Sequence, residues 1–177
     1  MSFAVEFAKL ADLEGGYVND PTDRGGATKF GITEKTARSL GFMGQMEHLT
    51  LEEAGLMYKK AYWDPLKLDE ITADFPEVAA ELFATAANQG VQTAGKFLQE
   101  AINLVDAGAG KDDLLVDGLI GLGSLGRLAS IKGDPLRSRV LLKTLNCLQA
   151  ERYIEICRRD PTQRRFFRGW LDKRVNP

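Results

Sequence analysis

The residues of this sequence that are best placed to do chemistry lie in one short stretch near its start. Glu14 is followed six residues later by Asp20 and nine residues later by Asp23, and Thr28 lies five residues beyond Asp23. Two acids on short, rigid connections around a cleft can cleave a glycosidic bond, since one protonates the leaving oxygen while the other activates water. We therefore expect the Glu, one Asp and the Thr to converge on a single water.

The two kinds of carboxyl group are predicted to differ in protonation. Glu14 closes an apolar helical stripe and would be partly desolvated against Phe7 and Leu10, so it would keep its proton near neutral pH and act as general acid. An Asp in a wetter ribbon would stay ionised and act as base. Asp20 and Asp23 are also common turn-forming residues, so the residues alone leave their role open between turn and catalyst.

The elements that must position these residues are a helix and a ribbon. Ser2 is a typical N-cap, and Phe3, Phe7, Leu10 and Glu14 follow one helical face until Gly15-Gly16 ends the helix. Residues 17–30 alternate and are interrupted by Asp-Pro and Gly-Gly, which predicts a short hairpin.

The remainder of the sequence predicts helices and therefore a mainly α fold. Capping residues and proline positions place the helices at 33–41, 50–62, 76–90, 92–105 and 134–159, with a last helix after Asp160-Pro161 that returns its aromatic residues, Trp170 included, to the core. The glycine-rich residues 106–126 are interpreted as a loop. We place a catalytic part at 1–105 and a second helical part at 106–177, packed together as one globular unit.

The residue inventory excludes several other chemistries. A single histidine, His48, cannot build a zinc site together with Cys147 and Cys157, which fall roughly 15 Å apart on one predicted helix. The same spacing rules out a disulfide between them, so we expect two buried free thiols. No loop has calcium-binding or phosphate-binding spacing. We expect no metal and no cofactor.

Charge is distributed unevenly along the sequence. The net charge is −2, yet residues 137–177 hold 11 of the 23 basic residues and only 4 of the 25 acidic ones. This pattern indicates either a surface for an anionic polymer or a solvated helical face, and both interpretations stay open. No nucleic-acid motif accompanies it. No run is long enough to span a membrane, and the first residues lack the features of a signal peptide, so we expect synthesis in the cytoplasm.

The stretch around Glu14 resembles a known family. Its motif is Glu14-Gly15-Gly16-Tyr17, then Asp20-Pro21 and Asp23-x-Gly25-Gly26-x-Thr28-x-x-Gly31-Ile32-Thr33, and it is similar to glycoside hydrolase family 108, the phage-type and prophage-type N-acetylmuramidases. Further matches follow in order at residues 62–65, 83–90, 97–99, 117–121 and 167–175. The C-terminal half resembles the helical, predicted peptidoglycan-binding segment that accompanies this family.

The resemblance implies a lysozyme-like fold with a small hairpin beside the cleft, and a bacteriolytic glycosidase that cleaves the β-1,4 bond between N-acetylmuramic acid and N-acetylglucosamine. It implies Glu14 as the catalytic acid, with Asp23 and Thr28 as the second and third members and Asp20 in reserve. Candidate substrate-binding residues are Tyr17, Asp20, Lys29 and Asn88. From the residues alone, Tyr17 can equally pack, and Asn88 can equally cap the helix that ends at Gly90.

Other functions remain open at this point. A lytic transglycosylase needs only one Glu, and a non-catalytic peptidoglycan-binding or secretion-related module needs none. The expected partner is bacterial peptidoglycan, without nucleic acid and without stable membrane insertion, and the chain is expected to be a monomer. A phage or prophage endolysin would reach the cell wall after release by a separate protein.

Overall fold

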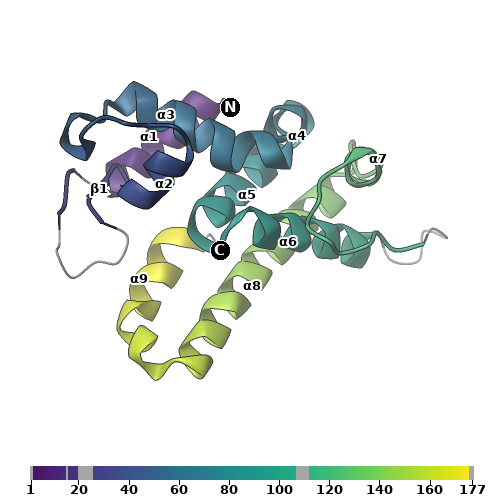
Figure 1. The fold of residues 1–177 in the computed structure, drawn as a ribbon. Helices are drawn as coiled ribbons and strands as arrows, with labels where there is room; N and C mark the ends of the chain where they lie inside the picture. Colours follow the sequence, from purple (N-terminus) through teal and green to yellow (C-terminus); the bar gives the residue numbers. More distant parts are fainter. Residues whose placement is uncertain (1, 15, 20–25, 107–111, 176–177) are drawn as a thin grey trace. The chain divides into compact units, whose positions relative to one another are not determined.

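The fold, in a computed structural model that describes residues 2–14, 16–19, 26–106 and 112–175, is built mainly from helices. These residues form nine α-helices and one two-stranded hairpin (Figure 1). The predicted fold class, mainly α with one small hairpin, is confirmed. Backbone packing divides the chain into a first unit, residues 1–65, and a second unit, residues 66–177.

The first unit begins with α1 (Phe3–Glu14), which ends at the residue predicted from the sequence. Its apolar stripe packs on α3 (Leu51–Tyr58), where the ring centroids of Phe7 and Tyr58 lie 5.3 Å apart. Gly55 makes this approach possible, because a Cβ there would lie 3.1 Å from the Phe7 ring. Close helix packing therefore fixes the helix that carries Glu14.

The hairpin of the first unit consists of β1 (Thr28–Lys29) and β2 (Ile32–Thr33), paired antiparallel with Lys29 opposite Ile32. Phe30 and Gly31 form the two-residue turn with φ values of 50° and 74°, as in a type I′ hairpin. A bulky residue rarely adopts positive φ, and the Tyr58 hydroxyl donates a hydrogen bond of 3.2 Å to the Phe30 carbonyl at this turn. The core thus holds the turn in place.

Short helical segments make up the rest of the first unit. Helix α2 (Glu34–Ser39) is capped by Thr33, and η1 (Met46–His48) follows it. A capping box formed by Thr50 and Glu53 opens α3, close to the predicted start of the helix at residue 50. The predicted helix 50–62 instead ends as an α-helix at Tyr58 and widens into a π-helical turn, η2 (Lys59–Trp63), followed by η3 (Asp64–Leu66). Trp63 is buried against Phe3, with ring centroids 5.3 Å apart.

The second unit is a set of packed helices. They are α4 (Leu68–Asp74), α5 (Pro76–Gln89), α6 (Val91–Val105), α7 (Leu122–Ala129), α8 (Pro135–Arg159), η4 (Pro161–Gln163) and α9 (Arg164–Arg174). Helices α5, α6 and α8 pack against one another, and α9 runs back beside α8 (Figure 1). In the part of the chain that the structure describes, no helix is both long and apolar enough to cross a membrane.

The predicted loop at residues 106–126 is wrong in its last part. Residues 112–121 form no helix, but α7 begins at Leu122 despite its glycines. Ser124, Leu128 and Ile131 are buried at i, i+4 and i+7, so apolar periodicity outweighs the low helix propensity of glycine here. The boundary predicted between residues 105 and 106 stays a prediction, because units defined by packing need not coincide with functional parts.

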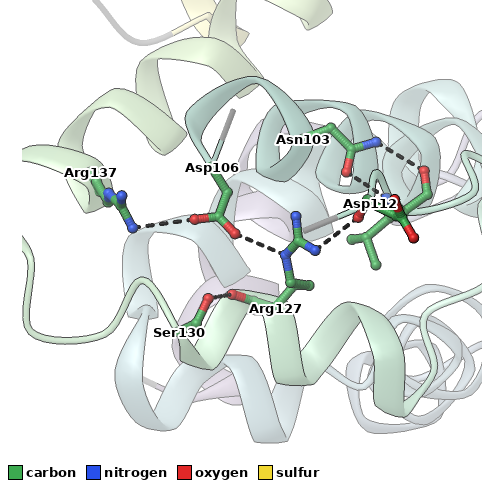
Figure 2. Close-up of polar contacts among 7 residues, drawn as sticks. Asn103, Asp106, Asp112, Arg127, Ser130 and Arg137 are labelled. Atoms are coloured by element: carbon green, nitrogen blue, oxygen red, sulfur yellow. Dashed lines mark hydrogen bonds and ion pairs between the residues drawn. The ribbon is translucent and has the colours of Figure 1, made fainter. Parts of the chain in front are cut away.

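A buried ion-pair cluster joins three helices of the second unit (Figure 2). Asp106, at the end of α6, is buried and accepts from Arg127 Nε of α7 at 2.8 Å and from Arg137 of α8 at 3.2 Å. Arg127 also donates to the Asp112 carbonyl at 2.9 Å. Removing Asp106 would take away the buried carboxylate that Arg127 and Arg137 share, so the cluster fixes how these helices meet.

Two segments matched in the sequence resemblance meet at Gln99. Its amide donates to Asp117 Oδ1 at 2.8 Å, and its carbonyl oxygen accepts from the Gly118 amide at 2.7 Å. The hydrogen bond from Gln99, followed by one from the Leu119 amide, lowers the pKa of Asp117. Gly118 has φ 84°, and its backbone lies so close to Gly95 that a Cβ at Gly95 would clash. The two segments that the resemblance matched therefore pack directly on one another through these hydrogen bonds.

Two packing predictions are corrected. Both cysteines are free as expected, but only Cys157 is buried and Cys147 is exposed, since it lies on the outer face of α8. No residue of α9 is buried, so the aromatic residues of this helix do not enter the core as predicted. Trp170 is partly exposed and stacks on Tyr153, with ring centroids 5.0 Å apart.

Candidate active site

The proposed acid, Glu14, is the last residue of α1, and the structure describes its backbone position. Asp20 and Asp23 lie outside the described residues. The predicted grouping of these three residues is therefore untested, and the site must be judged from the residues that border them.

Thr28 has a well-defined place beside the chain that follows Glu14. Its amide donates to the Val18 carbonyl at 2.7 Å, and the Val18 amide donates to the Thr28 carbonyl at 2.8 Å. Thr28 also lies opposite Thr33 in the hairpin, so Val18, Thr28 and Thr33 form one row across three extended segments. The segment that holds both Asp candidates thus begins at Val18, four residues after Glu14, and ends at Thr28.

Tyr17 lines a polar hollow on the first unit. This hollow has a volume of about 280 Å³, and Tyr17 is 41% exposed within it. Its other lining residues include Glu34 and Arg38, joined by an ion pair of 2.7 Å. A tyrosine ring beside amide, carboxylate and guanidinium groups is suited to a polar ligand such as a sugar. Tyr17 is thus placed where a substrate could reach it, and its role stays a prediction.

The described contacts of Lys29 are with the protein. Its Nζ donates to the Glu47 carbonyl and lies 5.3 Å from the centroid of the Phe30 ring. These contacts link β1 to η1 and stabilise the hairpin turn. A sugar would have to share this cation with the Glu47 carbonyl, so substrate binding by Lys29 stays a prediction.

Asn88 belongs to the second unit. Its amide nitrogen donates to the Ala84 carbonyl at 2.8 Å within α5, and α5 ends at the next residue, Gln89. Asn88 also lines a pocket formed by α5, α8 and α9. The remaining acceptor of its side chain is thus on a surface that a ligand can reach, which is compatible with the predicted binding role without testing it.

The residue-based reasoning missed a buried acid, Glu81 of α5. Only 5% of its surface is exposed, and burial raises the pKa of Glu81 to about 7, although a hydrogen bond from Thr85 opposes the shift. The Thr85 hydroxyl donates to Glu81 at 3.2 Å and accepts from the Gln149 amide at 2.9 Å. The signal was present in the sequence, since the polar residues Glu81, Thr85 and Gln89 recur every four residues along this helix.

Comparison with protein families agrees with the resemblance. Residues 7–90 match the family described as Glycosyl hydrolase 108, and residues 93–175 match the Predicted Peptidoglycan domain. The chain thus combines a glycosyl hydrolase 108 region with a predicted peptidoglycan domain, and the family assignment made from the sequence is confirmed. Together the two matches support a glycoside hydrolase that acts on peptidoglycan.

A solved structure extends this likeness to the whole chain. The chain is similar to the structure of Brucella abortus SagA, with 26% sequence identity and a TM-score of 0.70. The likeness covers 97% of this chain and 88% of the SagA chain. Comparison with curated proteins gives no match.

Proposed function

We propose that this protein is a lysozyme, an N-acetylmuramidase that hydrolyses the β-1,4 bond between N-acetylmuramic acid and N-acetylglucosamine. The observation that carries the proposal is the position of Glu14. It closes a packed helix, and the segment with both Asp candidates begins four residues later and ends at Thr28. This arrangement lies inside the region that matches glycosyl hydrolase 108.

In the proposed mechanism Glu14 is the general acid. The C-terminal end of a helix is the negative end of its dipole, which favours the neutral form of a carboxyl group placed there. Glu14 gives its proton to the glycosidic oxygen as the bond breaks. Asp23 removes a proton from water, and Thr28 orients the same water toward C1 of the muramic acid, with Asp20 as the reserve base.

This assignment predicts inversion at C1. An inverting enzyme keeps its two carboxyl groups roughly 6.5–9.5 Å apart to admit water, whereas a retaining enzyme brings them to about 5–5.5 Å. A helix end and a separate ribbon, with a proline among the intervening residues, favour the wider gap. The first product detected by proton NMR should therefore be the α anomer, and a β anomer would overturn the assignment of Asp23 as base.

Digestion of purified peptidoglycan, followed by mass spectrometry of the new ends, tests the reaction class. Reducing muramic acid ends are expected. Anhydro-muramic ends would instead establish a lytic transglycosylase, and an undigested wall that still binds the protein would establish a binding module. Reducing glucosamine ends would show that the enzyme cleaves the other glycosidic bond.

The setting proposed for this activity is that of a phage or prophage endolysin. The protein is made in the cytoplasm, acts as a monomer and reaches the wall after a separate protein permeabilises the membrane. Expression in a bacterial host with and without a co-expressed pore-forming protein tests this route. Lysis is expected only with the pore, and lysis without it would contradict the proposed release.

A further inference from the structure

Tyr58 is a buried tyrosine of the first unit to which the reaction described above gives no part. It is the last residue of α3 and only 4% exposed. Its hydroxyl donates a hydrogen bond of 3.2 Å to the carbonyl of Phe30, at the turn of the hairpin. The hairpin begins at Thr28, the residue proposed to orient the attacking water. Tyr58 therefore contacts the element that carries one proposed member of the site.

The ring of the same tyrosine contacts the helix that carries the proposed acid. The ring centroids of Tyr58 and Phe7 lie 5.3 Å apart, and Phe7 is a buried residue of α1, the helix that ends at Glu14. Gly55, one turn before Tyr58, brings α3 close enough for this contact, since a Cβ there would lie 3.1 Å from the Phe7 ring. One side chain thus touches both the helix of the acid and the turn of the hairpin.

The turn that accepts this hydrogen bond has a backbone conformation that its sequence disfavours. Phe30 has a φ of 50°, which Gly or Asn adopts far more readily than a bulky aromatic residue does. Among the described residues other than glycine, only Phe30 and Lys67 have positive φ. Such a conformation persists where the surrounding structure holds it, and it is found most often at functional sites. The Tyr58 hydroxyl supplies one such hold.

The hairpin is short, so the place of its turn determines the place of Thr28. Strands β1 and β2 have two residues each, and Thr28 lies only two residues before Phe30. On its other side, Thr28 exchanges backbone hydrogen bonds of 2.7 and 2.8 Å with Val18. A shift of the turn therefore moves Thr28, and a displacement of about 1 Å can lower the rate of an enzyme by about 10²-fold.

We propose that Tyr58 is a positioning residue, which sets the place of Thr28 relative to the helix that carries Glu14. Its ring packs on α1 and its hydroxyl holds the turn of the hairpin, so it couples the proton donor to the residue that orients the water. Tyr58 itself transfers no proton and does not touch the substrate. The proposal rests on the proposed function for the roles of Glu14 and Thr28.

Tyr58→Phe tests this role, because it removes the hydroxyl and keeps the ring. Hydrolysis of soluble, uncross-linked peptidoglycan strands by the full-length protein gives kcat and KM separately. We expect kcat to fall about tenfold and KM to stay within about twofold, because Thr28 acts on the water and not on the binding of the sugar. A tyrosine that only stabilises the fold would lower Tm and leave kcat unchanged at temperatures well below Tm. That result would overturn the proposal.

A matched control and a rescue variant accompany this measurement. Tyr62→Phe loses the same atom from a ring that lies 5.3 Å from the Tyr58 ring, and its kcat should be unchanged. Phe30→Asn, added to Tyr58→Phe, creates the Asn-Gly pair that a type I′ turn favours, so the turn no longer depends on the hydroxyl and kcat should recover at least about threefold. An equal loss in Tyr62→Phe, or no recovery in the double variant, would contradict the assignment.

Amide hydrogen exchange, measured by NMR, tests the positioning without any reaction. The Thr28 amide should exchange about tenfold faster in Tyr58→Phe than in the unaltered protein, because the turn is held less firmly. The Ala54 amide, which donates to the Thr50 carbonyl at 3.0 Å in the first turn of α3, should exchange at the same rate in both proteins. Faster exchange of both amides to the same extent would indicate a general loss of stability and would overturn the proposal.

The two readouts distinguish failure of this proposal from failure of the proposed function. If the unaltered protein cleaves peptidoglycan while Tyr58→Phe has normal kcat and normal exchange at Thr28, the assignment of Tyr58 is wrong and the hydrolase stands. If the unaltered protein leaves peptidoglycan uncut while exchange at Thr28 rises in Tyr58→Phe and not in Tyr62→Phe, the proposed function is wrong and the hold of Tyr58 on the hairpin stands.

Discussion

The two units of this protein place their polar groups in different ways. In the first unit, the candidate groups follow the ends of short elements: Glu14 closes α1, and Thr28 opens the hairpin. In the second unit, polar side chains lie inside the contact between long helices, as Glu81, Thr85 and Gln149 do between α5 and α8. Groups at element ends can reach a substrate, whereas groups between helices act on packing and on one another.

The difference also explains how each unit is held rigid. The first unit fixes its ribbon by backbone pairing and by one strained turn, with Phe30 at positive φ beneath the Tyr58 hydroxyl. The second unit fixes its helices through buried ion pairs around Asp106 (Figure 2). We infer that chemistry belongs to the first unit and recognition to the second, and the following variants test this division.

The largest effect is expected for Glu14→Gln. Loss of the proton donor should lower the rate of wall clearing by about 10³-fold, within the range that general acid catalysis contributes. The fold should be unchanged, since the substitution keeps the shape of the side chain. Turbidity of a cell-wall suspension measures the rate, and circular dichroism measures the fold.

Asp12→Asn is the control for this variant, because Asp12 is an exposed acid on the same helix. It should clear walls at the rate of the unaltered protein. Near-normal clearing by Glu14→Gln would show that Glu14 is not the proton donor. It would therefore contradict the assignment of the chemistry to the first unit.

A smaller but still large loss is expected for Asp23→Asn. Without the base, turnover should fall by about 10²-fold while binding to intact walls stays the same, because the variant changes only the activation of water. Asp20→Asn is the paired comparison and should lose less than a factor of about ten. The opposite order, measured as release of reducing ends, would make Asp20 the base.

The sequence predicts where the first helix of the first unit ends better than it predicts the second unit's polar interior. Glu14 and Thr28 belong to a local motif, and the Gly15-Gly16 pair marks where α1 ends, so short-range rules suffice. Thr85, which donates to Glu81, and Gln149 lie 64 residues apart in the sequence, and each alone is an ordinary helical residue. The hydrogen bond between them follows from the packing of α5 on α8, which single-sequence rules do not give.

The errors have equally specific causes. Glycines at 121, 123 and 126 indicated a loop, but the buried row of Ser124, Leu128 and Ile131 stabilises α7. The aromatic residues of α9 indicated a core helix, yet they stack on one another and on Tyr153 at the surface. In both cases the residue type is compatible with two structures, loop or helix for glycine and core or surface for the aromatic residues. Tertiary packing determines which of the two forms.

Glu81→Gln tests the claim that the second unit's polar groups act on stability. The pKa of Glu81 rises from 4.5 to about 7 on folding, mainly through burial. Between these two pH values the unfolded chain has lost the proton that the native state keeps. The contribution of Glu81 to the free energy of unfolding is therefore fully present below about pH 4 and is lost as pH rises through 7. The loss amounts to about 3 kcal/mol above pH 8.

The glutamine variant should lack this fall, because it cannot ionise. It should match the unaltered protein at pH 5 and exceed its free energy of unfolding at pH 8 by about 2–3 kcal/mol, as measured by urea denaturation. Glu100→Gln, at an exposed position of α6, should show no such pH dependence. Equal stability of the Glu81 variant and the unaltered protein at both pH values would contradict the burial argument.

The smallest effect is expected on the basic surface of α9. Arg164, Arg165 and Arg168 are exposed, so replacing all three with Gln should weaken sedimentation with whole walls by about three- to tenfold in low salt. The dependence of binding on salt should become flatter, while cleavage of short soluble oligosaccharides should not change. A control with Lys35, Lys60 and Arg139 replaced by Gln removes the same charge from scattered exposed positions, and should bind walls more strongly than the α9 variant. Equal binding by the two triple variants would mean that net charge alone attracts the wall, and that the clustered arginines of the second unit are a solvated face without a recognition role.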